Sequence, residues 1–261
     1  MKNMAMNFGI SPKSMDYTKF LILARSRTGS NYLRGLLNSH QRVIVFGEIF
    51  KNQEAIEWGM TGYPQDEQTL ILFQNDPAKF LDLAVFRAYP RGTEAVGFKL
   101  FYYHAHDTAL EPIWAYLKLR TDIKVIHLKR RNILKTHLSR KRAVLTDKWE
   151  NLDGSEAKER PITLDYEECL QDFVQTRAWE QEYDQYFQDH PFLAVTYEDL
   201  ASNKEVELRR IEDFLAIEHK PLTPETFKQS RKPLYETIAN YDELRTRFEG
   251  TPWESFFNEV E

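Results

Sequence analysis

The chain has 261 residues, of which 42% are hydrophobic, and a formal net charge of −5. This length suits one α/β domain with insertions, and this composition supplies a sizeable core, which excludes global disorder. The acidic balance argues against a general nucleic-acid-binding protein. The single cysteine, Cys169, excludes an internal disulfide and a cysteine metal cluster, and no apolar run has the length of a membrane span. We therefore expect a soluble, cytoplasmic protein that binds no nucleic acid, and contact with a membrane surface stays open.

Short apolar runs alternate with helix-like stretches after a loose lead-in over residues 1–17. The apolar runs are continuous, which is typical of strands buried on both faces, and the other stretches show helical spacing or helix-start signals. In chain order we predict a strand at 20–24, a helix at 31–39, a strand at 42–46, a helix start near 75–77, strands at 95–101 and 123–128, helices at 132–144 and 173–188, a strand at 192–197 and a helix at 204–215. This alternation predicts an α/β, P-loop-like three-layer fold, with a central, mostly parallel sheet of about five strands flanked by helices.

We expect one domain over residues 1–261, without a linker or an internal repeat. Residues 51–94 are mixed and residues 147–172 are acidic and loop-like, and both are predicted as insertions at the acceptor site. The tail at 223–261 carries scattered aromatic residues and is the predicted C-terminal flap region. Ligands of parallel α/β sheets bind at the carboxyl ends of the strands. The polar residues expected at that edge are Arg25 to Ser30, Glu48, Lys99 and Lys129 to Asn132.

The loop ARSRTGSN at 24–31 follows the first core strand and precedes a helix, an arrangement in which many proteins bind phosphate. It lacks the Gly-Lys pair of the usual nucleoside-triphosphate loop. Gly29 permits positive φ, the helix N-terminus favours an anion, and Arg27 can fork two phosphate oxygens. From these residues alone an ordinary polar turn stays open as the alternative. The candidate ligands in the loop are Arg25, Ser26, Arg27, Thr28, Gly29, Ser30 and Asn31.

A basic segment surrounds the end of the fourth strand, since residues 118–142 hold ten lysines or arginines and one acid in a chain that is acidic overall. This local reversal of charge indicates an anionic partner. Arg131 precedes Asn132, a good helix N-cap, and Ser139 follows Arg131 by eight residues, about 12 Å along an ideal helix. Helix geometry permits the two to share one phosphate without demanding it. For other basic residues here, such as Arg140, a solvated helix face is the simpler interpretation.

Several segments resemble the sulfotransferases. SRTGSNYL resembles their 5′-phosphosulfate loop, and RNILKTHLS resembles their 3′-phosphate motif, in which a serine follows an arginine by eight residues. FGEIF, GFKLF, VTYEDLASN and the tail RKPLYETIANYDELRTRFEGTPWESFF resemble bacterial carbohydrate sulfotransferases, most closely the rhizobial nodulation-factor enzymes and more loosely the mycobacterial trehalose sulfotransferases. The matching segments extend from about residue 19 to residue 257, and their joint order and spacing are more specific than any one motif.

The resemblance implies a sulfotransferase that uses 3′-phosphoadenosine 5′-phosphosulfate (PAPS) as donor and releases 3′-phosphoadenosine 5′-phosphate (PAP). The 5′-phosphosulfate would lie in the loop at 26–31, and Arg131 with Ser139 would bind the 3′-phosphate. Lys228, Arg231 and Lys232 would close over the nucleotide, although the glycine-rich flap of the animal enzymes is not visible in this tail. The transfer requires no metal.

The general base differs from that of the animal enzymes. Their base is the histidine of a KxH pattern, but the matching stretch here is KLF at 99–101. Glu48 stands in a Gly-Glu setting in which carbohydrate sulfotransferases use a glutamate as base, and partial burial could raise its proton affinity. Glu48 is therefore the predicted base, with His104 and His106 as second choices. A helix-terminal or salt-bridged glutamate is the structural alternative.

Two cations are the predicted stabilisers of developing charge. Arg27 would stabilise the leaving phosphate; the animal cytosolic enzymes carry lysine at this place and related bacterial enzymes carry arginine. Lys99 would contact the moving sulfuryl group or the bridging oxygen. The alternative for Lys99 is a lysine at the edge of a strand that has no catalytic role.

The sequence itself gives the least information about the acceptor. The resemblance implies a hydroxyl of a saccharide or glycolipid, while a lipid, a steroid-like molecule and a peptide tyrosine stay open. It also makes a homodimer one expected assembly, although no interface pattern is visible. Two other classes compete: a phosphate-loop kinase, which the absent Gly-Lys pair and magnesium aspartate disfavour, and a catalytically silent nucleotide-binding protein. The joint presence of five residues argues against the silent protein: Arg27, Glu48, Lys99, Arg131 and Ser139.

Overall fold

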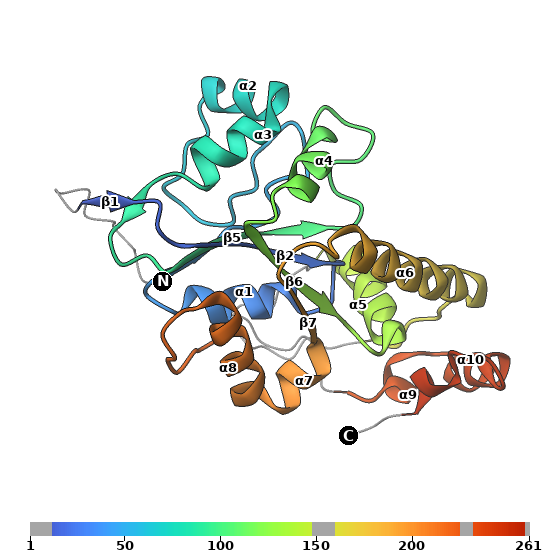
Figure 1. The fold of residues 1–261 in the computed structure, drawn as a ribbon. Coiled ribbons are helices and arrows are strands. Elements are labelled where there is room, and N and C mark those ends of the chain that lie inside the picture. The colour runs from blue at the N-terminus through green and yellow to red at the C-terminus, as the bar shows by residue number, and fades with distance from the viewer. Residues whose placement is uncertain (1–11, 148–159, 225–231, 259–261) are drawn as a thin grey trace.

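A sheet of five parallel strands, in the order β3-β5-β2-β6-β7, forms the centre of the protein (Figure 1). The computed structural model describes residues 12–147, 160–224 and 232–258. The strands are β1 Lys13–Ser14, β2 Thr18–Ala24, β3 Val43–Val45, β4 Tyr89–Pro90, β5 Ala95–Phe101, β6 Ile123–Lys129 and β7 Phe192–Thr196, of which β1 and β4 form a separate antiparallel pair. The predicted three-layer α/β fold and its five core strands are confirmed.

Helices cover both faces of the central sheet. On one face lie α1, α7 and α8, and on the other lie α2, α3 and α4 (Figure 1). The helices are α1 Ser30–Asn38, α2 Glu67–Asn75, α3 Pro77–Phe80, α4 Pro112–Leu119, α5 Ile133–Thr146, α6 Tyr166–Tyr186, α7 Tyr197–Ser202, α8 Lys204–Leu215, α9 Leu234–Thr237 and α10 Tyr241–Phe248, with a π-helix η1 Leu81–Val85 and a 3₁₀-helix η2 Glu254–Phe257.

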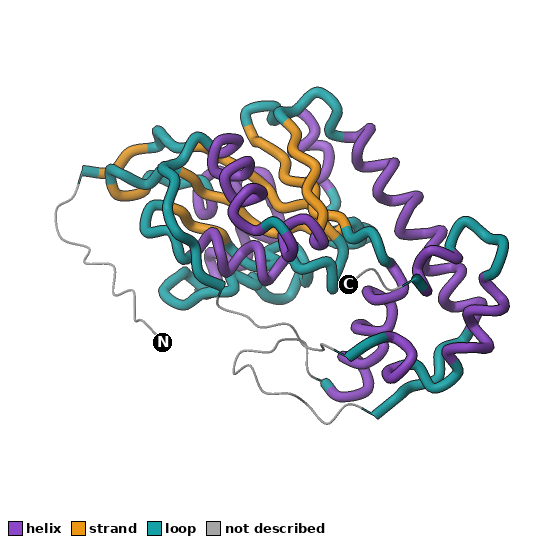
Figure 2. Tube along the Cα trace, turned by 90° about the horizontal axis from the view of Figure 1, so that it is seen from below, coloured by secondary structure: helices purple, strands orange, loops and turns teal. Residues whose placement is uncertain are grey.

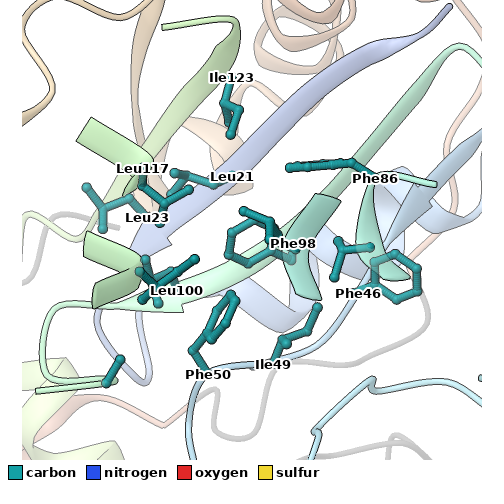
Figure 3. Close-up of a cluster of buried hydrophobic side chains, with 14 of the residues drawn as sticks. Leu21, Leu23, Phe46, Ile49, Phe50, Phe86, Phe98, Leu100, Leu117 and Ile123 are labelled. Carbon is teal, nitrogen blue, oxygen red and sulfur yellow. The ribbon is translucent and has the colours of Figure 1, made fainter. Parts of the chain in front are cut away.

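The central strand β2 divides its apolar side chains between the two faces. Leu21 and Leu23 join one buried cluster, while Phe20 and Ile22 join the cluster on the opposite face. Figure 3 shows the first cluster, in which Leu21 is opposite Phe98 and Leu23 is opposite Leu100 of the neighbouring strand β5. Because both faces are covered, the strand is continuously apolar, as the sequence predicts for a parallel sheet.

The segment 51–94 completes the core on the face shown in Figure 3. Trp58, Phe73 and Phe80 are buried there, and the ring centroids of Phe73 and Phe80 lie 5.0 Å apart in an edge-to-face contact. Buried aromatic pairs of this kind add to the stabilisation that area burial provides. This segment, predicted as an insertion, therefore carries core side chains as well as residues of the cavity described below.

The long helix α6 begins earlier than predicted. The Asp165 side chain accepts a hydrogen bond from the backbone N–H of Glu168 at 2.9 Å and caps a helix that starts at Tyr166 instead of residue 173. The loop prediction for 147–172 is therefore wrong for the part that lies in α6. Residues 148–159 lie outside the described residues.

The C-terminal elements pack as a third apolar cluster. Helices α9, α10 and η2 contribute Leu234, Phe248 and Phe256, which meet Phe173 of α6 and Ile133 of α5. The Phe173 ring centroid lies 5.4 Å from that of Phe248 and 5.1 Å from that of Phe256. Figure 2 shows these helices gathered beyond one end of the strands. The scattered aromatic residues of the tail thus anchor it beside α5 and α6.

Candidate active site

A cavity of about 970 Å³ opens at the carboxyl edge of the sheet. Cations outnumber acids on its described walls, which reverses the negative balance of the whole chain. Such a concentration of positive charge attracts and retains anions. Its cationic residues are Arg27, Arg34, Lys51, Lys99, Arg130, Lys135, Arg140, Arg142 and Lys232, and its acids are Glu48 and Glu57.

The loop between β2 and α1 forms one wall of the cavity through Ser26, Arg27, Gly29, Ser30 and Asn31. Gly29, with φ of 91°, is the N-cap of α1, and Arg27 also adopts positive φ, at 69°. The loop therefore turns directly into a helix N-terminus, where backbone N–H groups and the helix dipole favour an anion. The predicted phosphate loop has the geometry expected of an anion site.

Gly29 also lies against Tyr197, the first residue of α7. A Cβ atom placed on Gly29 would lie 2.3 Å from Cδ2 of Tyr197. We expect Gly29→Ala to lower the free energy of unfolding through positive φ, about 1–2 kcal/mol, and through overpacking, about 1–3 kcal/mol more. Urea denaturation measures both. Gly62→Ala is the matched control, because Gly62 has φ of +88° but a Cβ placed on it would meet no described atom within 4 Å. Equal losses in the two variants would contradict the contact with Tyr197.

Arg27 joins the two predicted phosphate motifs. Its Nε donates a hydrogen bond to Oγ of Ser139 at 2.9 Å, and its backbone carbonyl accepts one from Nη1 of Arg130 at 3.0 Å. Both Ser139 and Arg130 line the cavity. The loop after β2 and the helix after β6 therefore meet at one arginine.

Two loop residues predicted as donor ligands have a different placement. The Arg25 guanidinium is buried, pairs with Asp172 of α6 and hydrogen-bonds to Thr176. Thr28 is also buried, and its Oγ1 donates to the Arg25 carbonyl at 2.7 Å. Neither belongs to the cavity lining. These side chains hold the loop in shape, and the placement of Arg25 and Thr28 does not match the predicted ligand role.

Arg131 likewise lies away from the cavity. Its guanidinium pairs with Asp199, and its side chain is 57% exposed. The preceding residue, Arg130, lines the cavity instead. Ser139 lines the cavity and Arg131 does not, so the placement of Arg131 does not match the predicted role beside the 3′-phosphate.

Glu48 and Lys99 line the cavity side by side. The Lys99 ammonium is 3.1 Å from Oε1 of Glu48 and also donates to Oδ1 of Asn31 in the phosphate loop. Lys99 is almost fully buried, whereas the Glu48 side chain is 22% exposed towards the cavity. The predicted base and the predicted cation thus share one hydrogen-bonded cluster with the phosphate loop.

His104 faces the other carboxylate oxygen of Glu48. Its Nε2 lies 3.8 Å from Oε2 of Glu48, and its Nδ1 accepts the backbone N–H of Phe101 at 3.2 Å. Accepting that bond places the proton of the neutral ring on Nε2, which faces Glu48. Burial lowers the pKa of His104 to about 4, so the ring is neutral near pH 7.

His106, the other second choice, lies outside the cavity lining. Its Nε2 lies 3.0 Å from the carbonyl oxygen of Tyr102 and 2.9 Å from the hydroxyl of Tyr183, and its ring stacks on Trp114. These contacts belong to the packing of α4 and α6 against the sheet. The placement of His106 therefore does not match a role as base.

One face of α5 contributes cavity residues that the sequence analysis did not single out. Lys135, Leu138 and Arg142 line the cavity together with Ser139. Lys135 lies four residues before Ser139 and Arg142 three residues after it, so helical periodicity counted from Ser139 identifies these two. Arg140, for which a solvated face is the simpler interpretation, also lines the cavity and contacts the buried Asp172 at 2.6 Å.

The tail reaches the same cavity through Lys232, Leu234 and Thr237. The predicted nucleotide contacts Lys228 and Arg231 lie outside the described residues. Within the described ranges, no group of three or more histidine, cysteine, aspartate or glutamate side chains could hold a metal ion. In the same ranges, no helix has the length and apolar character needed to cross a membrane.

Fold and site together define an α/β protein whose phosphate-loop-like turn opens into a basic cavity. The profile described as the Sulfotransferase family matches residues 20–221, so the chain belongs to the sulfotransferase family. It is a transferase that acts on sulfuryl groups, as predicted.

Two relatives are similar in sequence to most of this chain. Nodulation protein H of Rhizobium meliloti is 27% identical over 248 residues, which cover 91% of this chain and 94% of the relative. Nodulation protein H of Rhizobium tropici is 26% identical over 247 residues, covering 91% and 92%. Among solved structures, a sulfotransferase from Alicyclobacillus acidocaldarius has a TM-score of 0.49 and 16% identity, covering 93% of this chain and 97% of that one.

Proposed function

We propose that the protein transfers a sulfuryl group from PAPS to a hydroxyl of a saccharide or glycolipid, with Glu48 as general base. The observation that carries this proposal is the cluster in which Lys99 contacts both Glu48 and Asn31. It joins a carboxylate open to the cavity directly to the phosphate loop. A transfer reaction needs this proximity, because the acceptor oxygen and the bond that breaks must be aligned.

The donor end of the cavity suits a phosphosulfate. Ser30, the first residue of α1, lines the cavity together with Arg27. Backbone N–H groups and a guanidinium there would bind the 5′-phosphate oxygens. Negative charge grows on the bridging oxygen during transfer, and Arg27 and Lys99 are placed to stabilise it. No metal enters this proposal.

The reaction is an in-line displacement at sulfur. Glu48 takes the proton of the acceptor hydroxyl while the acceptor oxygen forms a bond to sulfur. The bond from sulfur to the bridging phosphate oxygen breaks, and its electron pair stays on that oxygen, which leaves as part of PAP. Oε1 of Glu48 faces Lys99, so Oε2 is the oxygen that receives the proton. The neutral His104 beside Oε2 orients the carboxylate or the acceptor oxygen and does not itself act as base.

The donor is tested by thermal unfolding with PAP, AMP, ADP and ATP–magnesium. A ligand that binds only the folded protein adds about 2.7 kcal/mol when its concentration is 100 times its Kd. We expect PAP to raise Tm most, because the other nucleotides lack a 3′-phosphate for the cavity cations. A larger shift with ATP–magnesium, or none with PAP, would contradict the donor assignment and favour a kinase-like site.

The acceptor is tested with a donor that carries labelled sulfate. Saccharides, glycolipids, a steroid-like alcohol and a tyrosine peptide are supplied in turn, and transfer of label identifies the class. The saccharide proposal follows from the resemblance of FGEIF, GFKLF and VTYEDLASN to carbohydrate sulfotransferases. Labelling of the peptide or the steroid-like alcohol alone would overturn it and leave sulfuryl transfer intact.

A further inference from the structure

The two arginines at the end of β6 have opposite surroundings. The Arg131 side chain is 57% exposed and pairs with Asp199, whose carboxylate also accepts a hydrogen bond from Thr196 at 2.7 Å. The Arg130 side chain is 14% exposed and lines the cavity. Motif spacing assigns the 3′-phosphate to Arg131, but Arg130 is the one that faces the space where a ligand can lie.

Arg130 is held in place by contacts on two sides. Its Nη1 donates to the backbone carbonyl of Arg27 at 3.0 Å, and its guanidinium lies 4.7 Å from the ring centroid of Tyr197. A planar guanidinium that is stacked and hydrogen-bonded in this way loses little further entropy when it binds an anion. Arg130 is thus preorganised at the wall of the cavity.

Its hydrogen bonding is incomplete. Nε of Arg130 is buried and has no hydrogen-bond partner among the described residues. Oε1 of Glu198 is 3.9 Å away, too far for a hydrogen bond, and Glu198 accepts backbone N–H groups of residues 131 and 132 instead. A buried, unsatisfied donor on a cation is costly, and an oxyanion is the ligand that satisfies it.

The neighbouring side chains fit the same ligand. The Arg27 side chain donates a hydrogen bond to Ser139 at 2.9 Å, and the Arg27 backbone carbonyl accepts one from Arg130 at 3.0 Å. Arg27 thus connects Ser139 and Arg130, and all three line the cavity. Lys135, one turn before Ser139 on α5, adds a further cation to that wall. A hydroxyl, a forked guanidinium and an ammonium together suit a phosphate monoester, which carries up to two negative charges.

We infer that Arg130, and not Arg131, supplies the guanidinium that binds the donor's 3′-phosphate monoester beside Ser139. Arg131 instead pairs with Asp199 in the first turn of α7 and stabilises the junction of β6 and α7. The inference rests on the proposed donor, and it reverses the assignment that the motif implies for this chain.

Isothermal titration with PAP and with AMP, which lacks the 3′-phosphate, tests the inference in Arg130→Gln and the matched Arg131→Gln. We expect Arg130→Gln to weaken PAP about 10- to 100-fold, because a hydrogen bond to a charged group is lost, and to weaken AMP much less. Arg131→Gln should leave both affinities within about threefold of wild type, since its ion pair is at the surface.

Arg130→Lys is a second variant in case Arg130→Gln does not fold. Lysine keeps the positive charge of the side chain but lacks the forked guanidinium and its Nε. This variant should melt close to wild type and still lose about tenfold in PAP affinity. Loss of the preference for PAP over AMP in Arg131→Gln, or its survival in a folded Arg130 variant, would overturn the inference. Failure of the wild-type protein to bind PAP would instead reject the donor itself.

Discussion

Replacing Glu48 with glutamine is expected to lower kcat by about 10²- to 10⁴-fold, while PAP still binds. Glutamine keeps the shape of the side chain but cannot take the acceptor's proton, although Lys99 and His104 remain beside it. Initial rates with labelled donor, on the first acceptor that the wild-type protein uses, measure kcat. The shift of Tm with PAP shows that the donor site is intact.

Glu57→Gln is the matched control for this prediction. Glu57 also lines the cavity, but its side chain is 47% exposed and lies 3.9 Å from Lys51, a surface pair of little energetic weight. We expect its kcat to stay close to wild type. A rate loss in Glu57→Gln with full activity in Glu48→Gln would move the base to Glu57.

Because the pKa of His104 is about 4, the rate above pH 5 should not follow titration of that ring.

Replacing Asp172 with asparagine is expected to lower the free energy of unfolding by about 3–5 kcal/mol. Asp172 is buried and contacts Arg25, Arg140 at 2.6 Å and Nδ1 of His137 at 3.0 Å. Removing its charge leaves two guanidinium groups with no compensating carboxylate in a buried site. Urea denaturation measures the loss. Asp213→Asn, which removes a surface partner of His219, is the control and should change stability by less than about 1 kcal/mol.

The same carboxylate makes stability depend on pH. Burial alone would raise the pKa of Asp172, but the hydrogen bond from His137 and the charges of Arg25 and Arg140 outweigh it and hold the pKa well below its usual range. A depressed carboxyl pKa stabilises the fold above the unfolded pKa, about 3.9, and this contribution is lost as pH falls below that value. Wild type should therefore lose its advantage over Asp172→Asn below about pH 4. A constant difference between pH 6 and pH 2 would contradict this linkage.

The fold was largely predictable because local pattern and burial agree. A strand buried on both faces is continuously apolar. The apolar run at 95–101 therefore predicts both ends of β5 correctly. The start of α6 was missed because Asp165 and the acidic residues after it also suit a loop. A capping aspartate is recognised only when the helical periodicity behind it is clear.

The sequence predicts which residues reach the site when strand order alone brings them there. It does not predict the direction of a side chain that depends on a partner far along the chain. Strands in a parallel sheet bring Glu48 and Lys99 to one edge, where the Lys99 ammonium lies 3.1 Å from the Glu48 carboxylate. The choice between Arg130 and Arg131 depends on Asp199, nearly seventy residues further along the chain. Likewise Arg25 turns inward because Asp172 of α6 is there to receive it.

The order of the strands fixes the order and the spacing of the site residues along the carboxyl edge of the sheet. Along its carboxyl edge come Glu48 after β3, Lys99 on β5, the loop after β2 and Arg130 after β6. In the proposed reaction this is also the chemical order of acceptor oxygen, sulfur, 5′-phosphate and 3′-phosphate. Neighbouring strands lie about 4.8 Å apart, so the three steps from β3 to β6 measure about 14 Å. Rearranging loops can change which acceptor enters, but the span of the proposed donor site is set by the spacing of the hydrogen-bonded strands.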